Sequence, residues 1–440
     1  MQGKNNNNYC IFVSHAKTKN LQMKKIPLLF LSVLMALPLG AQTAREEIAA
    51  DPDKAAGLHY AYPGPQSVQT PAPKGYRPFY ISHFGRHGSR WHIGQRDYIA
   101  PYETLKSAHE AAALTPLGEE VFRKAAVLEE DGRSRQGELT RLGVRQHQEI
   151  ARRMLRSFPE VFGKGARVTA NSTQSPRVMM SMFTFCNELK ASHPELEIDF
   201  NSSRRDGSFV AHRAKAQGPL GYDPKAEWTD FSTEITHPER LMDKLFADKQ
   251  YLRDSVDARA LYWQLYYIAE MAQNCGLDSL ALTQIFTPDE LYSLWEVDNY
   301  KEYVSIGPDP RGREVILASC KPMMAHVLDR AEETIAAGGR GATLRFSHDS
   351  YLLPMAVTLG LDGCREAAAS RETCDDVFAT YRTCPMCANI QMVFFRNRKG
   401  DVLVKFLLNE NEVSVPIPTD CAPYYHWADV RSYYRNLLQL

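Results

Sequence analysis

The feature that most constrains this chain is a short apolar strand pattern that runs directly into a basic turn. Residues 78–82 (PFYIS) have the composition of a buried strand, and residues 83–90 (HFGRHGSR) follow without a break. Within the turn, Arg86 and Arg90 flank His87, and Gly88 lets the backbone come close to a ligand. The pattern predicts a strand followed by a turn that holds something.

Strand and helix patterns alternate along much of the remaining chain. Helical spacing is found at 105–131, 138–158 and 175–191, and strand patterns are found at 166–171, 342–349, 389–395 and 402–409. This alternation predicts a parallel sheet with helices packed on it, and the last two strands predict a hairpin. Between about 200 and 335 the pattern is helical, without a competing strand. We therefore expect an α/β domain interrupted by a helical insert.

The N-terminal region has the pattern of a secretory signal peptide. Residues 23–41 contain a basic end, an apolar stretch too short and too proline-rich to anchor in a membrane, and a small-residue cleavage site near Ala41. Residues 1–22 are interpreted as an upstream extension. The predicted organisation continues with the first part of the α/β core (42–200), the helical insert (201–335) and the second part of the core (336–440).

Charge excludes one class of partner. The 440 residues carry 52 basic and 52 acidic side chains, but five of the lysines lie within residues 1–41, which contain no acid. The remaining chain has 47 basic against 52 acidic residues, a net charge of −5. A mildly acidic body is a poor nucleic-acid binder, so an anionic ligand must be held by a local basic cluster.

The RHGSR segment is such a cluster. Arg86 and Arg90 each offer a fork of donors suited to phosphate oxygens, and the N–H groups of a following helix would add to an anion site. An imidazole between them can attack phosphorus and carry the phosphoryl group. The alternative is a surface turn with scattered charge, and the pentapeptide alone does not decide between the two.

Three further segments occur in an order that resembles the histidine phosphatase superfamily, which has RHGxR after a strand. Residues 137–154 (GELTRLGVRQHQEIARRM) resemble an L-T-x-x-G segment whose turn and helix support the catalytic loop. Residues 170–185 match the segment that delivers a third arginine, here Arg177, and residues 344–361 match the one that carries a second histidine, here His348. The resemblance is to the large histidine acid phosphatase branch (clade 2) and covers most of residues 78–410.

Within that branch the chain is most similar to the multiple inositol polyphosphate phosphatases and phytases. Residues 348–361 (HDSYLLPMAVTLGL) and 402–417 resemble the H-A-E-x-L-L-P and L-L-N-E regions of that group. The chain departs by having His348-Asp349-Ser350 in place of His-Ala-Glu. The resemblance implies a phosphoglycerate mutase-like, three-layer α/β core with a helical insert domain.

The resemblance also implies roles for six residues. His87 is the nucleophile, and Asp349 is the general acid and then the base that assists water. Phosphate oxygens are bound by the remaining four (Arg86, Arg90, Arg177 and His348). Two simpler readings stay open: Arg177 could pair with an acid at a helix start, and Asp349 could cap the following helix. Because these side chains supply the positive charge, no metal or other cofactor is expected.

Candidate substrate contacts lie outside these motifs. His83 is close to the motif in sequence, and a basic patch near the start of the insert contains Arg204, Arg205, Arg213 and Lys215. These cations would suit a polyphosphorylated ligand such as an inositol phosphate, although a solvated loop explains them as well. His92 is a second histidine near the motif, and His147 is expected to be a packing residue.

Eight cysteines follow the predicted cleavage site, and five of them lie between positions 364 and 421. Export permits disulfides, and this clustering favours at least one bridge there. Cys384 and Cys387 have the spacing of a redox pair, but they precede a strand rather than open a helix. We therefore expect a structural or free-thiol role for them.

The sequence thus predicts an exported phosphomonoester hydrolase (periplasmic, cell-surface or secreted) that acts on small phosphorylated substrates, with inositol polyphosphates as the leading class. Alternatives are a broad-specificity acid phosphatase or a sugar phosphatase. A phosphoglycerate mutase-type phosphotransferase and a non-catalytic phosphate-binding protein fit the residues less well. No transmembrane span is expected in the mature chain, and the oligomeric state is not predicted.

Overall fold

The structure is a computed structural model that describes residues 42–205, 207–213, 221–280 and 282–440. The predicted upstream extension (1–22), the predicted signal peptide (23–41) and Lys215 lie outside the described residues. Among the residues described, no helix combines the length and apolar character needed to cross a membrane.

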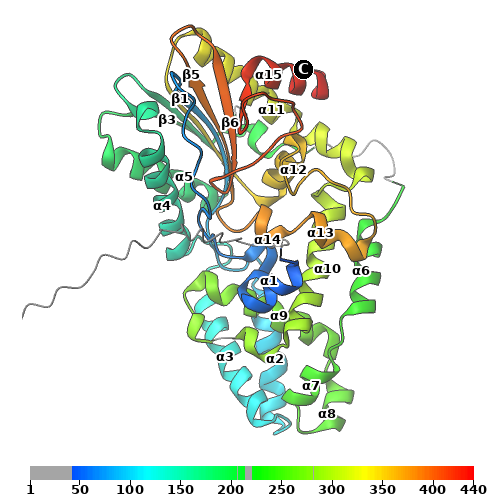
Figure 1. The fold of residues 1–440 in the computed structure, drawn as a ribbon. Helices are drawn as coiled ribbons and strands as arrows, with labels where there is room; N and C mark the ends of the chain where they lie inside the picture. Colours follow the sequence, from blue (N-terminus) through cyan, green and yellow to red (C-terminus); the bar gives the residue numbers. More distant parts are fainter. Residues whose placement is uncertain (1–41, 206, 214–220, 281) are drawn as a thin grey trace, which may run out of the picture. The chain divides into compact units, whose positions relative to one another are not determined.

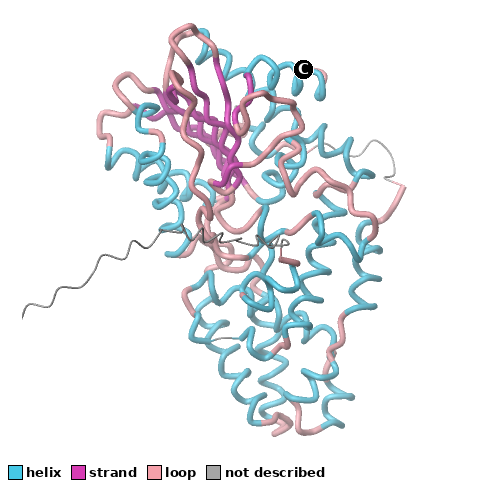
Figure 2. The backbone as a smooth tube through the Cα atoms, viewed as in Figure 1, coloured by secondary structure: helices cyan, strands magenta, loops and turns pink. Residues whose placement is uncertain are grey.

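One mixed sheet of eight strands forms the centre of the α/β region (Figure 2). The strand order is β3-β2-β4-β1-β5-β6-β7, and β8 pairs with β6. The strands are β1 (Arg77–Arg86), β2 (Arg167–Ser172), β3 (Glu197–Asn201), β4 (Gly341–Ser347), β5 (Asn389–Arg396), β6 (Val402–Leu408), β7 (Asn411–Glu412) and β8 (Tyr424–His426). Strands β1 to β4 are parallel as expected. β5 pairs antiparallel with β1, and β6 completes the predicted hairpin by pairing antiparallel with β5.

Helices cover both faces of this sheet, which gives the predicted three layers (Figure 1). The helices on the faces are α4 (Arg141–Ser157), α5 (Pro176–Ser192), α11 (Arg313–Ala336), α12 (Asp349–Leu359) and α15 (Trp427–Leu438). Ile150 of α4 and Val178 of α5 are fully buried in one core with Ile81 of the sheet. Leu352 and Val430 belong to the core on the opposite face. Apolar residues thus fill both sides of the strands, as in buried parallel sheets.

A separate core holds the helical region together. The helices built on this core are α2 (Arg96–Glu110), α3 (Pro116–Gly132), α7 (Glu239–Leu245), α8 (Lys249–Ser255), α9 (Ala258–Cys275) and α10 (Pro288–Ile306). Helix α6 (Pro224–Ile235) packs instead, through Phe231, on the core that covers one face of the sheet. Short helices α1 (Ala44–Ala50), α13 (Cys374–Val377) and α14 (Thr380–Thr383) and a 3₁₀ helix η1 (Pro52–His59) lie in the connecting segments. Helices α2 and α3 come from the part of the chain grouped with the α/β core by sequence, yet they pack against α9. The domain limits at 200 and 335 stay predictions.

Candidate active site

The predicted site residues meet at one edge of the sheet. Arg86 ends β1, and its register partner Ser347 ends β4. The His87 N–H donates to the Ser347 carbonyl (3.0 Å), while His348 follows directly in sequence. Because β1, β2 and β4 are parallel neighbours, their carboxyl ends share this edge, where α/β proteins commonly bind ligands.

The RHGSR turn rests on the start of α4, the segment expected to support it. The Thr140 hydroxyl donates to the Ser89 carbonyl (3.1 Å), and the Thr140 amide donates to the same oxygen (2.9 Å). A Cβ on Gly88 would lie 2.7 Å from the Gly143 Cα, and a Cβ on Gly143 would lie 2.3 Å from the Ser89 oxygen. Neither position has room for a side chain, so the two glycines permit the contact.

A second segment, residues 384–388, holds the turn from the other side. The Arg86 amide donates to the Ala388 carbonyl (2.8 Å), and the Cys387 amide donates to the His87 carbonyl (3.0 Å). The Cys384 carbonyl accepts a bond from Arg86 Nη1 (2.8 Å). These two cysteines therefore position the turn through their backbones, consistent with a structural role.

All eight cysteines in the described part of the chain are free thiols, so the bridge expected between positions 364 and 421 is not found. Most are buried in cores instead: Cys364, Cys374 and Cys384 lie in one core and Cys387 in another. Burial raises the pKa of the Cys384 thiol to about 12, which opposes thiolate chemistry at that position.

His87 is held as a neutral imidazole. Its Nδ1 lies 2.9 Å from the Gly88 carbonyl, which can only accept, so Nδ1 carries the proton and Nε2 keeps its lone pair. Burial, reinforced by the charge of Arg86, lowers the pKa of His87 well below its usual range. An unprotonated Nε2 is the form needed for nucleophilic attack.

Three arginines surround this imidazole with unused donors. Arg86 and Arg90 are buried and Arg177 is half-buried. The Nε atom of each is buried and finds no hydrogen-bond partner among the described residues. Burial and the nearby Arg86 lower the pKa of Arg90 to about 10. Buried like charges with unsatisfied donors are costly without a counter-charge, so the cluster is built to receive an anion.

Asp349 is the carboxylate that reaches this cluster. Its Oδ2 lies 2.5 Å from Arg86 Nη2, and its Oδ1 accepts the Ser350 amide (2.7 Å). Although burial acts to raise it, Arg86 holds the pKa of Asp349 far below its usual range. His348, and not Asp349, occupies the N-cap position of α12.

His348 and Arg177 contact each other. Arg177 Nη2 can only donate, so His348 Nδ1 accepts (3.3 Å) and Nε2 carries the proton toward the Thr173 hydroxyl (3.3 Å). The rings of His348 and His87 have centroids 5.5 Å apart. Burial lowers the pKa of His348 to about 4. No acid of the described residues lies within ion-pair distance of Arg177, so its partner is a histidine rather than a carboxylate.

The site opens into a pocket of about 440 Å³ whose wall includes residues that sequence reasoning missed. His59, at the end of η1, has Nε2 3.3 Å from Arg90 Nη2 and Nδ1 2.9 Å from the Glu270 carboxylate. Because the Arg90 guanidinium can only donate, His59 Nε2 accepts this hydrogen bond and the imidazole is neutral. Its Nδ1–H then donates to the Glu270 carboxylate. His59 thereby orients Arg90. No motif in the sequence marks either residue.

Helix α10 supplies the charged part of the wall. Lys301 Nζ lies 3.4 Å from the Asp298 carboxylate and 3.7 Å from that of Glu302. Burial raises the pKa of Glu302 to about 7. Asp97 also lines the pocket. The wall opposite the strand ends therefore carries a lysine already paired with acids.

The remaining predicted residues divide between the pocket and other places. Arg213 lines the pocket and lies 5.1 Å over the Tyr351 ring. Arg204 is exposed and bonded to Gln174 (2.5 Å), and Arg205 is also exposed. Neither lines the pocket around the catalytic turn.

Of the other histidines, only His92 lines the pocket, where it lies 2.8 Å from the Tyr267 carbonyl. His83 is buried between Phe185 and Phe346, so we leave it out of the proposed site. His147 is a packing residue, but both its ring nitrogens lack partners among the described residues.

One group of side chains in the described residues could hold a metal ion. Asp420, Cys421 and His426 bring three ligand atoms within 4.8 Å of one another on the loop before β8 and on β8 itself. None of these residues lines the pocket.

Solved structures match the chain, whereas no family model and no curated protein does. The Bifidobacterium longum multiple inositol polyphosphate phosphatase in complex with inositol hexasulfate has a TM-score of 0.68 and 18% identity, over 87% of this chain and 97% of that one. The phytase from D. castellii has a TM-score of 0.65 and 15% identity, over 92% of this chain and 88% of that one. The apo form of Hafnia alvei phytase has a TM-score of 0.52 and 12% identity, over 84% of this chain and 98% of that one. The chain therefore has the fold of the multiple inositol polyphosphate phosphatases and phytases.

Proposed function

We propose that the chain is a histidine acid phosphatase that hydrolyses phosphomonoesters through a phosphohistidine. One observation carries the proposal: a neutral His87 lies among three arginines whose buried Nε donors have no partner in the described residues. A phosphoryl group satisfies those donors and places phosphorus beside the imidazole. The fold shared with phosphatases supports the same conclusion.

The proposed reaction has two steps. Arg86, Arg90, Arg177 and His348 bind the phosphoryl oxygens. His87 Nε2 then attacks phosphorus, the ester P–O bond breaks, and the leaving oxygen takes a proton from Asp349. In the second step Asp349 removes a proton from water as the water attacks the phosphohistidine, and phosphate and free His87 are formed.

The ion pair of Asp349 suggests how it obtains its proton. In the free protein Arg86 stabilises the carboxylate, and the pKa of Asp349 is low. A bound phosphate dianion competes for Arg86 and repels the carboxylate, and both effects raise the pKa of Asp349. Asp349 therefore becomes protonated when the substrate binds, and turnover is favoured at acidic pH.

For the substrate, we propose inositol polyphosphates, with a sugar phosphatase or broad-specificity acid phosphatase as the second candidate. The first is supported by the likeness to a phosphatase crystallised with inositol hexasulfate and by Arg213 on the pocket wall. The second is supported by the Asp97, Asp298 and Glu302 side chains on the same wall. Ionised carboxylates repel additional phosphates, and carboxyl oxygens accept hydrogen bonds from the hydroxyl groups of a sugar.

The test is phosphate release from inositol hexakisphosphate, from a hexose monophosphate and from an aryl phosphate, between about pH 3 and about pH 8. We expect activity that disappears in His87→Ala, and the ratio of the three rates ranks the substrate classes. No release from any of them by folded wild-type protein would contradict the proposal.

We also propose that the protein is exported, on the basis of the signal-peptide pattern at 23–41. Expression in a host with a secretory pathway, followed by mass spectrometry of the mature N-terminus, tests this. A chain that begins close to Gln42 agrees with export, and a cytoplasmic chain that keeps residues 23–41 does not.

A further inference from the structure

A second basic site lies at the opposite edge of the same sheet. β1 runs from Arg77 to Arg86, and its carboxyl end carries the catalytic turn. At about 3.3 Å per residue, the two ends of this strand are roughly 30 Å apart. We propose that the hollow at the Arg77 end binds a ligand that carries several phosphate groups.

The hollow has a volume of about 830 Å³ and is lined by six cations. They are Lys74, Arg77, Arg340, Arg396, Arg398 and Lys399, against two acids, Glu160 and Asp401. The net charge of this lining is +4, whereas residues 42–440 as a whole carry a net charge of −5. Positive charge is therefore concentrated in this hollow, although residues 42–440 as a whole are acidic.

Like charges face each other across the strands at this edge. Arg77 of β1 and Arg396 of β5 are register partners, an arrangement that is destabilising when both side chains are cationic. Burial, and then the charge of Arg340, lower the pKa of Arg396. In the described part of the chain, none of the six cations forms an ion pair within 4.0 Å. Such mutual repulsion is relieved by an anion bound between them.

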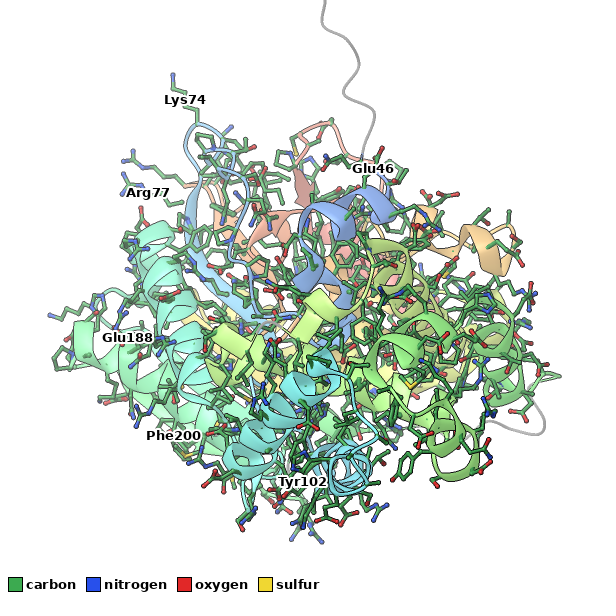
Figure 3. The ribbon with its side chains drawn as sticks, turned by 90° about the horizontal axis from the view of Figure 1, so that it is seen from below. Glu46, Lys74, Arg77, Tyr102, Glu188 and Phe200 are labelled. Carbon is green, nitrogen blue, oxygen red and sulfur yellow. The ribbon has the colours of Figure 1, made fainter. Side chains whose placement is uncertain are left out.

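Part of the site is already ordered. The Arg396 guanidinium lies 4.5 Å over the Phe79 ring and donates to the Gly338 carbonyl (3.0 Å). In the neighbouring turn, Asn397 Oδ1 accepts a hydrogen bond from the Lys399 backbone N–H (2.9 Å), and Asn397 Nδ2 donates one to the Asp401 carboxylate (2.7 Å). Lys74 and Arg77 extend away from the ribbon into solvent (Figure 3). The lining thus combines a fixed arginine with cations free to close on a ligand.

Phosphate is the chemistry that fits best. Four of the six cations are arginines, whose planar forks bind tetrahedral oxyanions with two donors at once. A single phosphate neutralises only part of a charge spread over this volume, so the ligand carries several. Such a ligand is either a soluble polyphosphorylated molecule or a set of phosphate headgroups at an anionic bilayer.

The test of the soluble source is calorimetric titration of the protein with inositol hexasulfate, which is not a phosphomonoester. We expect the Arg340→Ala/Arg398→Ala variant to lose one binding event seen in wild type, or to bind at least tenfold more weakly, with phosphate release unchanged. The control is Lys106→Ala/Arg253→Ala, which removes two exposed cations of α2 and α8 and should bind as wild type does. If the catalytic pocket binds nothing, wild type shows a single event, and the Arg340/Arg398 variant still loses it.

The bilayer source is tested by sedimentation with vesicles of phosphatidylcholine alone or mixed with phosphatidylglycerol. Binding to the mixed vesicles that is lost in the Arg340/Arg398 variant and weakened by salt assigns the site to lipid phosphates. Binding of the sulfated probe without the vesicles assigns it to a soluble ligand. The proposal is overturned if the variant and wild type bind both probes equally, or if wild type binds neither.

Discussion

The two walls of the catalytic pocket differ in how their charges are balanced. On the strand-end wall, Arg86 and Arg90 keep buried donors without partners in the described residues. On the helical wall, Lys301 is paired with Asp298 and faces Glu302. Three arginines beside the single carboxylate of Asp349 leave a net positive charge that attracts an anion strongly, whereas a lysine paired with acids adds little net positive charge. The first wall is therefore suited to phosphoryl chemistry, and the second to choosing what is attached to the phosphate.

This difference between the two walls predicts two kinds of mutational effect. Changes on the strand-end wall should act on turnover, that is, on the chemical steps at phosphorus. Changes on the helical wall should act on substrate affinity and on its pH dependence. Substitutions at four positions test this division and are given in order of decreasing effect.

The largest effect is expected for His87→Ala, because it removes the nucleophile. We expect kcat to fall by more than about 10⁴-fold for all substrates. Rapid-quench experiments on the wild type with a radiolabelled substrate should trap an acid-labile phosphoenzyme that His87→Ala lacks. A phosphoenzyme that persists in this variant would place the nucleophile elsewhere.

The next largest effect is expected for Asp349→Asn. Loss of the proton donor should lower the rate by about 10² to 10⁴ for an alkyl phosphate. It should lower it far less for p-nitrophenyl phosphate, whose leaving group departs without a proton. Equal losses for the two substrates would instead mean that Asp349 acts mainly by holding Arg86.

A smaller effect is expected for His59→Phe, which removes the acceptor that orients Arg90. A hydrogen bond to a charged group contributes about 1.5–3 kcal/mol, so kcat/KM should fall by roughly 10- to 150-fold. His59→Gln keeps an acceptor on the side chain and should recover part of the loss. If both variants behave like wild type, Arg90 is held by its neighbours without His59.

The smallest effect is expected for Glu302→Gln. Because the pKa of Glu302 is about 7 and its ordinary value is 4.5, the carboxyl is neutral in acid and ionised only above about pH 7. Its charge should then repel a phosphorylated substrate by about 1 kcal/mol, which raises KM about fivefold in wild type. In Glu302→Gln this rise should be absent, and the two proteins should have similar KM values in acid. Parallel pH profiles would contradict the assignment.

Motifs along the chain were sufficient to place the strand-end wall. RHGSR, the segment at 137–154 and the His348-Asp349 pair are each short and contiguous. The parallel order of β1, β2 and β4 brings the carboxyl ends of these strands together. Local patterns predict the helices and strands for the same reason, since apolar spacing reflects which face is buried.

The residues of the helical wall could not be predicted from sequence motifs. His59, Glu270 and Lys301 lie in three separate segments, and nothing in their neighbourhoods marks them as functional. They become neighbours only because the core of the helical region packs η1, α9 and α10 together. The same holds for the basic edge at Arg77 and Arg340, which are far apart in sequence. Local chemistry follows from short motifs, whereas the balance of charge in a pocket depends on which distant side chains the fold brings into contact.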